Sequence, residues 1–117
     1  MKEVLAIIQM NKMEATKDAL DVIGIPSITA YKVLGRGKQR GLQIPHPSEL
    51  EESEKKSKYI PKRMISIMVE DEFVPAVVAV VTKVNRTGNI GDGRVFVCTI
   101  DEAVRIRTGE RGNEAIS

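Results

Sequence analysis

Two strand–helix–strand patterns, separated by an aperiodic stretch at residues 35–59, constrain the fold of this chain more than any other feature. Four segments have the apolar patterns of strands: residues 3–9, 27–34, 64–70 and 94–99. The first is a continuous apolar run, which is typical of a strand covered on both faces. The order strand, helix, strand, loop, strand, helix, strand predicts an α+β, ferredoxin-like βαββαβ sandwich.

Helical periodicity lies between the two strands of each half. The first helix is expected to bury one stripe, formed by Ala15, Ala19, Leu20 and Ile23. We expect Asn11 to cap this helix and Gly24 to end it. Residues 71–85 predict the second helix, with Pro75 in its first turn and a buried face of Val74, Val77, Val78, Val81 and Val84.

The chain has 117 residues, which suits a single domain over residues 1–117 with one hydrophobic core. Since there are two Tyr, two Phe and no Trp, that core must be aliphatic. After the last strand, residues 104–108 alternate again, which places Arg105 and Arg107 on one face of an extended segment.

Catalysis and metal clusters have poor candidates in this sequence. The single cysteine, Cys98, excludes an internal disulfide or a zinc site of several cysteines, and we expect it to be a buried, inert thiol within its strand. The single histidine, His46, has no nucleophile nearby, so no catalytic group is predicted. The first apolar run is too short for a signal peptide or a membrane span, and we expect a reduced, cytoplasmic protein without a membrane span.

Anion binding has better candidates, in three glycine-rich or arginine-rich segments. Residues 35–41 (GRGKQRG) combine turn-forming glycines with Lys38 and Arg40, and residues 91–94 (GDGR) repeat the pattern before a strand. Arg105 and Arg107 supply forked donors that suit phosphate oxygens. Because the fold could bring the three segments together at one edge, we expect a polyphosphate ligand.

The long stretch is open to two interpretations. More than twenty residues without apolar periodicity indicate either a functional loop or a solvated spacer. The whole-chain charge of +2 does not distinguish them, because it averages a cationic phosphate region against acidic side chains in this stretch. Those acidic side chains are Glu49, Glu51, Glu52 and Glu54.

Three segments of the chain resemble the PII nitrogen-regulatory proteins. Residues 87–97 (TGNIGDGRVFV) followed by residues 104–116 (VRIRTGERGNEAI) are similar to the C-terminal signature of that family. Residues 35–41 resemble the base of its T-loop, and residues 1–8 (MKEVLAII) resemble its opening strand. The resemblance implies a homotrimer that binds ATP or ADP in clefts between subunits and senses 2-oxoglutarate beside Mg-ATP, with a T-loop at about residues 36–59.

The resemblance also implies roles for individual residues. The ATP or ADP site would comprise Thr29, Gly37, Lys38, Gly91, Asp92, Gly93, Arg94, Arg105 and Arg107, with Thr29 near the adenine. The 2-oxoglutarate site would comprise Gln39, Arg40, Gly41, Lys62 and Gly91, with Lys62 pairing with a ligand carboxylate. Gln39 would also coordinate Mg²⁺, which prefers oxygen ligands and is often held largely by phosphates.

The nitrogenase-associated subgroup of the family, whose members are often encoded as unlike pairs, is resembled by the long loop, by residues 33–38 (VLGRGK), by residues 84–89 (VNRTGN) and by the TGERG tail. This implies that the loop, with Glu49, Glu51, Glu52 and Glu54, docks on dinitrogenase and inhibits it until 2-oxoglutarate and ATP release it. No tyrosine stands at the usual mid-loop modification position, so uridylylation is not expected. A general PII protein that controls an ammonium transporter or glutamine synthetase is the alternative.

Two other classes of protein are weaker alternatives. A small RNA-binding domain would share the ferredoxin-like fold, but the strand at residues 94–97 lacks an aromatic stacking platform, so no nucleic-acid partner is expected. An enzyme is disfavoured because nothing in the chain supplies an activated nucleophile.

Overall fold

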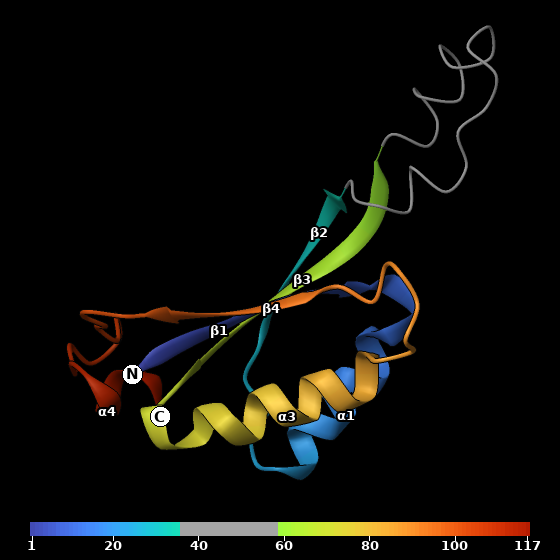
Figure 1. Cartoon of the computed structure of the whole chain (residues 1–117). Coiled ribbons are helices and arrows are strands. Elements are labelled where there is room, and N and C mark those ends of the chain that lie inside the picture. The colour runs from blue at the N-terminus through green and yellow to red at the C-terminus, as the bar shows by residue number, and fades with distance from the viewer. Residues whose placement is uncertain (36–58) are drawn as a thin grey trace, which may run out of the picture.

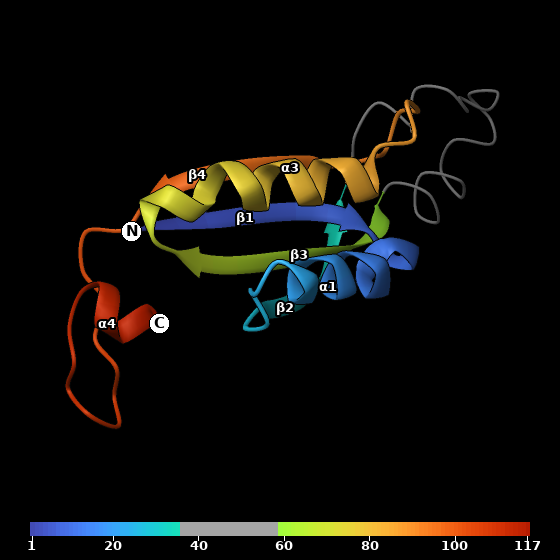
Figure 2. The same cartoon turned by 90° about the horizontal axis from the view of Figure 1, so that it is seen from below.

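A computed structural model describes residues 1–35 and 59–117 of the chain. Four antiparallel strands form one sheet in the order β2-β3-β1-β4, and helices α1 and α3 cover one of its faces (Figures 1 and 2). The main elements are β1 (Lys2–Gln9), α1 (Met13–Val22), β2 (Thr29–Gly35), β3 (Ile60–Val69), α3 (Val74–Asn85) and β4 (Arg94–Thr99). The short helices are η1 (Met10–Lys12), η3 (Asp71–Phe73) and α4 (Asn113–Ile116). The predicted βαββαβ order is confirmed.

The core lies between the sheet and the two helices. It consists of aliphatic side chains, as the composition predicts: Val4, Ala6, Ile8, Leu20, Ile65, Ile67, Val69, Val77 and Val81. On β1 only alternate residues are buried, so the prediction of a strand covered on both faces is wrong for the described chain. The reason is that both helices pack on the same face, which leaves the other face of the sheet open.

A polar contact joins α1 to α3 inside the predicted apolar interface. Thr16 is fully buried and donates to the carbonyl of Lys12, and Asn85 Nδ2 donates to Thr16 Oγ1 at 2.9 Å. Of the predicted stripe on α1, Leu20 is buried whereas Ala15 is exposed. The predicted cap is also wrong, because Asn11 lies within η1 and residue 12 occupies the cap position.

The uncovered face of the sheet carries large apolar side chains. Directly paired residues of neighbouring strands share a face, so the partners of Glu3, Leu5 and Ile7 point away from the helices. On this face Tyr31 is 47% exposed, Met68 42% and Phe96 43%. Cys98 pairs with Glu3 and is exposed, which corrects the prediction of a buried thiol. It lies on an edge strand, on the face that no helix covers.

The C-terminal segment is a tight turn rather than the predicted extended segment. Residues 106–108 form the turn, which the Gly109 N–H closes by donating to the Arg105 carbonyl at 2.7 Å. Gly109 has a φ of 75°, a conformation that glycine adopts without strain. Arg105 and Arg107 are therefore not related by strand alternation, because the backbone reverses where the strand was expected to continue.

Within residues 1–35 and 59–117, no helix is long and apolar enough to cross a membrane.

Candidate functional site

A buried lysine lies at the end of the sheet where β1 ends and β3 begins. Lys62 is 7% exposed and is paired in register with Gln9 on one side and Val33 on the other. Its ammonium donates to the Gly91 carbonyl at 2.6 Å, and Gln9 Nε2 donates to the same oxygen at 3.1 Å. The two contacts tie the loop before β4 to the two central strands of the sheet.

Asp92 organises the loop between α3 and β4. Its carboxylate accepts from the Thr87 hydroxyl, from the Thr87 N–H at 2.7 Å and from the Gly88 N–H at 2.9 Å. The Thr87 hydroxyl bond is the main cause of a lowered pKa for Asp92, and the Thr87 and Gly88 N–H groups lower that pKa further. Desolvation opposes this shift without reversing it. Asp92 is therefore held as an anion that shapes the loop.

Glycine is required where this loop crosses the end of β1. Gly93 has a φ of 106°, and a methyl group on its Cα would lie 1.8 Å from the Ile7 carbonyl oxygen. Gly91 has a φ of 105°. The next residue, Arg94, is exposed and pairs with Ile7 in register. The loop thus brings Gly91 and Arg94 to the same end of the sheet as Lys62.

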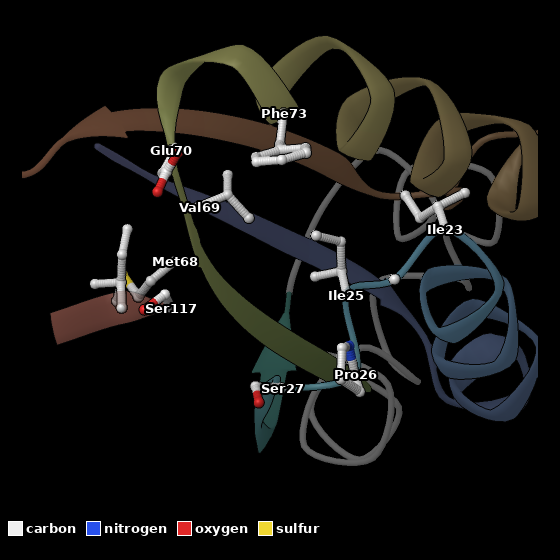
Figure 3. A pocket seen from close by; sticks show the side chains of 11 residues that line it. Ile23, Ile25, Pro26, Ser27, Met68, Val69, Glu70, Phe73 and Ser117 are labelled. Carbon is white, nitrogen blue, oxygen red and sulfur yellow. The ribbon is translucent and has the colours of Figure 1, made fainter. Parts of the chain in front are cut away.

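A pocket lies at the other end of the sheet (Figure 3). Its volume is about 290 Å³, and its walls come from the segment before β2, the end of β3, η3 and the C-terminus. Ser27 and Met68 lie on one side of it and Phe73 on another. Ser117 also lines the pocket, and its carbonyl accepts from Arg105 Nη2 at 2.7 Å. Concave, mainly apolar pockets with a few polar groups are typical of small-molecule sites.

Comparison with known proteins identifies the family. The family model for nitrogen regulatory protein P-II matches residues 1–110. The chain belongs to the P-II family. It is 54% identical to the nitrogen fixation nifHD region GlnB-like protein 2 of Methanothermobacter marburgensis over 121 residues, which cover 99% of this chain and 100% of the relative. It is 40% identical to the nitrogen regulatory protein P-II of Rhodospirillum rubrum over 116 residues, 99% of this chain and 100% of that protein.

A solved structure agrees with the family assignment. The crystal structure of Arabidopsis thaliana PII bound to citrate superposes with a TM-score of 0.78 at 29% identity, covering 99% of this chain and 89% of that one. The nifHD-region name recurs for a relative in Methanosarcina barkeri, which is 50% identical over 122 residues, 99% of this chain and 99% of the relative. The resemblance to PII proteins and to their nitrogenase-associated subgroup is therefore confirmed.

The P-II chain divides its predicted nucleotide residues between the two ends of the sheet. Arg94 and residues 91–93 lie beside Ile7, whereas the C-terminal segment leaves β4 at Thr99, which pairs with Lys2 (Figures 1 and 2). Eight residues of β1 separate these ends by about 24 Å. The expectation that all three anion-binding segments meet at one edge is therefore wrong within a single chain.

Arg105 and Arg107 define what we call the arginine end of the P-II chain, and the two side chains differ in burial and in contacts. Arg105 is half-buried and donates to Glu110 Oε1 at 3.0 Å and to the carbonyls of Glu114 and Ser117. Arg107 is exposed, and within the described residues its side chain makes no hydrogen bond or ion pair. Thr29 begins β2 and is paired with Ser66, two residues from the pocket wall at Ser27. Arg105 is thus joined to the pocket through Ser117, and Thr29 follows the pocket wall in sequence but lies level with the middle of β1.

Several predicted site residues lie outside the described part of the P-II chain. These are Gly37, Lys38, Gln39, Arg40, Gly41, Glu49, Glu51, Glu52 and Glu54, and His46, which was not predicted as a site residue, also lies there. Gly35, at the end of β2, marks where the first of the glycine-rich segments begins: a methyl group there would lie 3.4 Å from Lys62 Cγ. Gly35 therefore lies beside Lys62.

Sequence reasoning missed two residues of the P-II loop site, Gln9 and Thr87. Gln9 is the last residue of an apolar strand, and the sequence around it carries no motif that indicates a role in binding. Its role depends on strand register, which places it beside Lys62. Thr87 carried a local signal, since a Thr five residues before an Asp within a glycine-rich loop can form a side-chain bridge of this kind.

Replacing Thr87 with Val is expected to change how the stability of the protein against urea depends on pH. The substitution removes the hydroxyl donor, so the pKa of Asp92 should rise toward its ordinary value of 3.8. A carboxylate with a depressed native pKa stabilises the fold above its unfolded pKa and loses that effect as pH falls through the native pKa. At neutral pH the urea midpoint of Thr87→Val should therefore be lower than that of the wild-type protein. The difference between the two midpoints should become smaller well below pH 3.8.

Thr82→Val provides the control for this experiment, because Thr82 is exposed on α3. The difference in urea midpoint between Thr82→Val and the wild-type protein should not change with pH. An equal difference for Thr87→Val at neutral and acidic pH would mean that the hydroxyl does not act through ionised Asp92.

Proposed function

We propose that this P-II protein is a homotrimeric regulator of nitrogen fixation that binds ATP or ADP between subunits and senses 2-oxoglutarate. The observation that carries the proposal is the division of the predicted nucleotide residues between opposite ends of one chain. We call the end of the sheet with residues 91–94 and Lys62 the loop end. Because the two ends lie about 24 Å apart, they form one site only when the arginine end of one chain meets the loop end of another. A closed ring of identical chains provides this contact at every interface.

The uncovered face of the sheet supports the assembly. Tyr31, Met68 and Phe96 are each more than two-fifths exposed on a face that no helix covers in the described chain. Large apolar side chains exposed on one face are typical of a surface that binds a partner. We propose that this face packs against the other two copies, which buries it at the centre of the trimer.

The nucleotide would bind with its base at the pocket end of one chain and its phosphates at the loop end of the neighbouring chain. Thr29 and the apolar 290 Å³ pocket suit a flat, mainly apolar base with polar edges. Residues 91–94, with Gly37 and Lys38, would hold the phosphates through backbone N–H groups and cationic side chains. Arg105 and Arg107 would reach the same phosphates from the pocket end.

Lys62 is well placed for the 2-oxoglutarate site. It is a buried ammonium whose described partner is a neutral carbonyl, so an incoming carboxylate offers it the added attraction of an opposite charge. Gln39, Arg40, Gly41 and Gly91 would complete this site. Gln39 would also supply an amide oxygen to Mg²⁺, which would join the nucleotide phosphates to the 2-oxoglutarate site.

The names of the relatives support nitrogenase as the partner. The relatives in Methanothermobacter marburgensis and Methanosarcina barkeri are both nifHD-region proteins. We propose that the T-loop, with its acidic residues Glu49, Glu51, Glu52 and Glu54, docks on dinitrogenase and inhibits it, alone or in a mixed assembly with a paralogue. 2-Oxoglutarate with ATP would favour a loop state that does not dock.

Calorimetry with ATP, Mg²⁺ and 2-oxoglutarate added in different orders tests the ligand part of this proposal. We expect 2-oxoglutarate to bind only after Mg-ATP. The partner is tested by pull-down from extract, with ADP or with Mg-ATP plus 2-oxoglutarate. Capture of dinitrogenase with ADP and its release by 2-oxoglutarate would support the proposal, whereas capture of an ammonium transporter or glutamine synthetase alone would identify a general PII protein.

Gln39→Ala is expected to weaken 2-oxoglutarate binding about 30-fold and to leave ADP binding within about twofold, because one amide oxygen links the metal and the effector but not the nucleotide alone. Calorimetric titration of both ligands measures the difference. Gln43→Ala, four residues along the same loop, is the matched control. Equal 2-oxoglutarate affinities for Gln39→Ala and wild type would contradict the role of Gln39.

A further inference from the structure

We propose that Gln9 is a positioning residue that holds the Gly91 carbonyl when Lys62 turns from that carbonyl to a ligand carboxylate. This inference rests on the proposed 2-oxoglutarate site and concerns how that site opens. It depends on a contact in the described chain: one carbonyl oxygen accepts from both Lys62 and Gln9.

The two donors fill the acceptor capacity of the Gly91 carbonyl, which has two lone pairs. The Lys62 contact is the shorter, at 2.6 Å against 3.1 Å for Gln9. Among the described residues, no carboxylate lies within ion-pair distance of Lys62. In this state the Gly91 carbonyl therefore occupies the position beside the Lys62 ammonium that a ligand carboxylate would take.

A carboxylate that binds Lys62 must compete with this carbonyl. The exchange is favourable for the ammonium, since a carboxylate adds the Coulomb attraction of an opposite charge, which a neutral carbonyl lacks. It is unfavourable for the carbonyl unless a second donor remains, because a partly buried acceptor that loses its partner loses the free energy of that bond. Gln9 is already in contact, so it provides that donor without any rearrangement.

The position of Gln9 in the sheet makes this role specific. It is the last residue of β1 and pairs in register with Lys62, so the two side chains leave the sheet side by side on the same face. Gly91 has a φ of 105°, and in the described chain the two side-chain donors Lys62 and Gln9 hold its carbonyl. Loss of both donors would release residues 91–93, which the proposed site also uses.

Gln9→Met tests the proposal, because methionine matches the length of glutamine and has no N–H donor. We expect 2-oxoglutarate, titrated into protein saturated with Mg-ATP, to bind about tenfold more weakly to this variant. ATP affinity without 2-oxoglutarate should stay within about twofold of wild type, because Lys62 still holds the Gly91 carbonyl in that state. Gln9→Lys restores a nitrogen donor of similar reach, and its 2-oxoglutarate affinity should return to at least the wild-type value.

Amide hydrogen exchange at residues 91–93 separates positioning from general structural damage. In Gln9→Met, exchange should match wild type in the ligand-free protein and become faster only with Mg-ATP and 2-oxoglutarate bound. Faster exchange in both states would mean that Gln9 only stabilises the fold, and it would overturn the proposal.

Two further outcomes keep the proposal separate from the function on which it rests. Wild-type 2-oxoglutarate affinity in Gln9→Met would overturn the role of Gln9 and leave the proposed function in place. Failure of the wild-type protein to bind 2-oxoglutarate at all would overturn the proposed function itself. Thr99→Val, which removes a polar side chain at the far end of β4, is the matched control and should bind both ligands normally.

Discussion

Replacing Arg105 and Arg107 together with alanine is expected to weaken ATP binding at least about 100-fold. Each charge-assisted bond from a guanidinium to a phosphate contributes about 1.5–3 kcal/mol, so two lost bonds reduce affinity by at least two orders of magnitude. Calorimetry measures the loss. The sheet and its two helices should stay folded, because these arginines lie in the C-terminal turn beyond the core.

Single variants separate the two arginines. Arg105 also bonds to Glu110 and to the carbonyls of Glu114 and Ser117, so Arg105→Ala loosens the C-terminal segment as well. Arg107 makes no such contact in the described chain, and Arg107→Ala alone should therefore report phosphate binding. Arg111→Ala is the matched control, since Arg111 is an exposed arginine of the same segment that pairs with Glu102. Wild-type ATP affinity in the double variant would remove these arginines from the site.

Mixing two defective chains shows whether the site lies between subunits. Arg94→Ala damages the loop end, whereas the double arginine variant damages the pocket end. In trimers reassembled from an equal mixture, about a quarter of the clefts should combine two intact ends and bind ATP with wild-type affinity. A site within one chain would give no recovery at any mixing ratio.

Gly93→Ala is expected to destabilise the fold by about 4 kcal/mol. The new methyl would lie 1.8 Å from the Ile7 carbonyl oxygen and 2.9 Å from its carbon, at a φ of 106°. Since both neighbours are backbone atoms of a central strand, β1 or the loop must move. Urea denaturation measures the loss.

Gly88→Ala is the matched control for this substitution. Gly88 has a φ of 85° in the same loop, and nothing lies within 4 Å of an added methyl group. Gly88→Ala should therefore reduce the free energy of unfolding by only about 1 kcal/mol, because alanine is strained at a positive φ. Equal losses for the two variants would mean that the close approach to Ile7 is relieved by a small shift of the loop.

Part of the fold could be predicted from the sequence because it depends on local patterns. The last strand was predicted at residues 94–99, and β4 spans Arg94–Thr99. The helix before it was predicted at residues 71–85, which the structure divides into η3 and α3. Turn glycines and valine periodicity act within a few residues, so their effect does not require knowledge of distant parts of the chain.

The errors arose where a residue depends on what lies across the sheet. Cys98 follows an apolar pattern but is exposed, because in the part of the chain that the structure describes no helix covers its face of the edge strand. Residues 104–108 alternate like a strand, yet among the described residues they pair only through the bridge between Val104 and Arg111. Alternation without a pairing partner does not maintain an extended conformation.

The sequence by itself determined the order of the elements, the aliphatic core and the family, since these depend on periodicity and on motifs that are contiguous in the chain. Only the tertiary structure decided that Gln9 and Lys62 share the Gly91 carbonyl, and that Arg105 and Arg107 lie at the opposite end of the sheet from Arg94. The reason is strand register. A one-residue shift in pairing exchanges the faces of a sheet, and the direction of each strand sets which loops share an end.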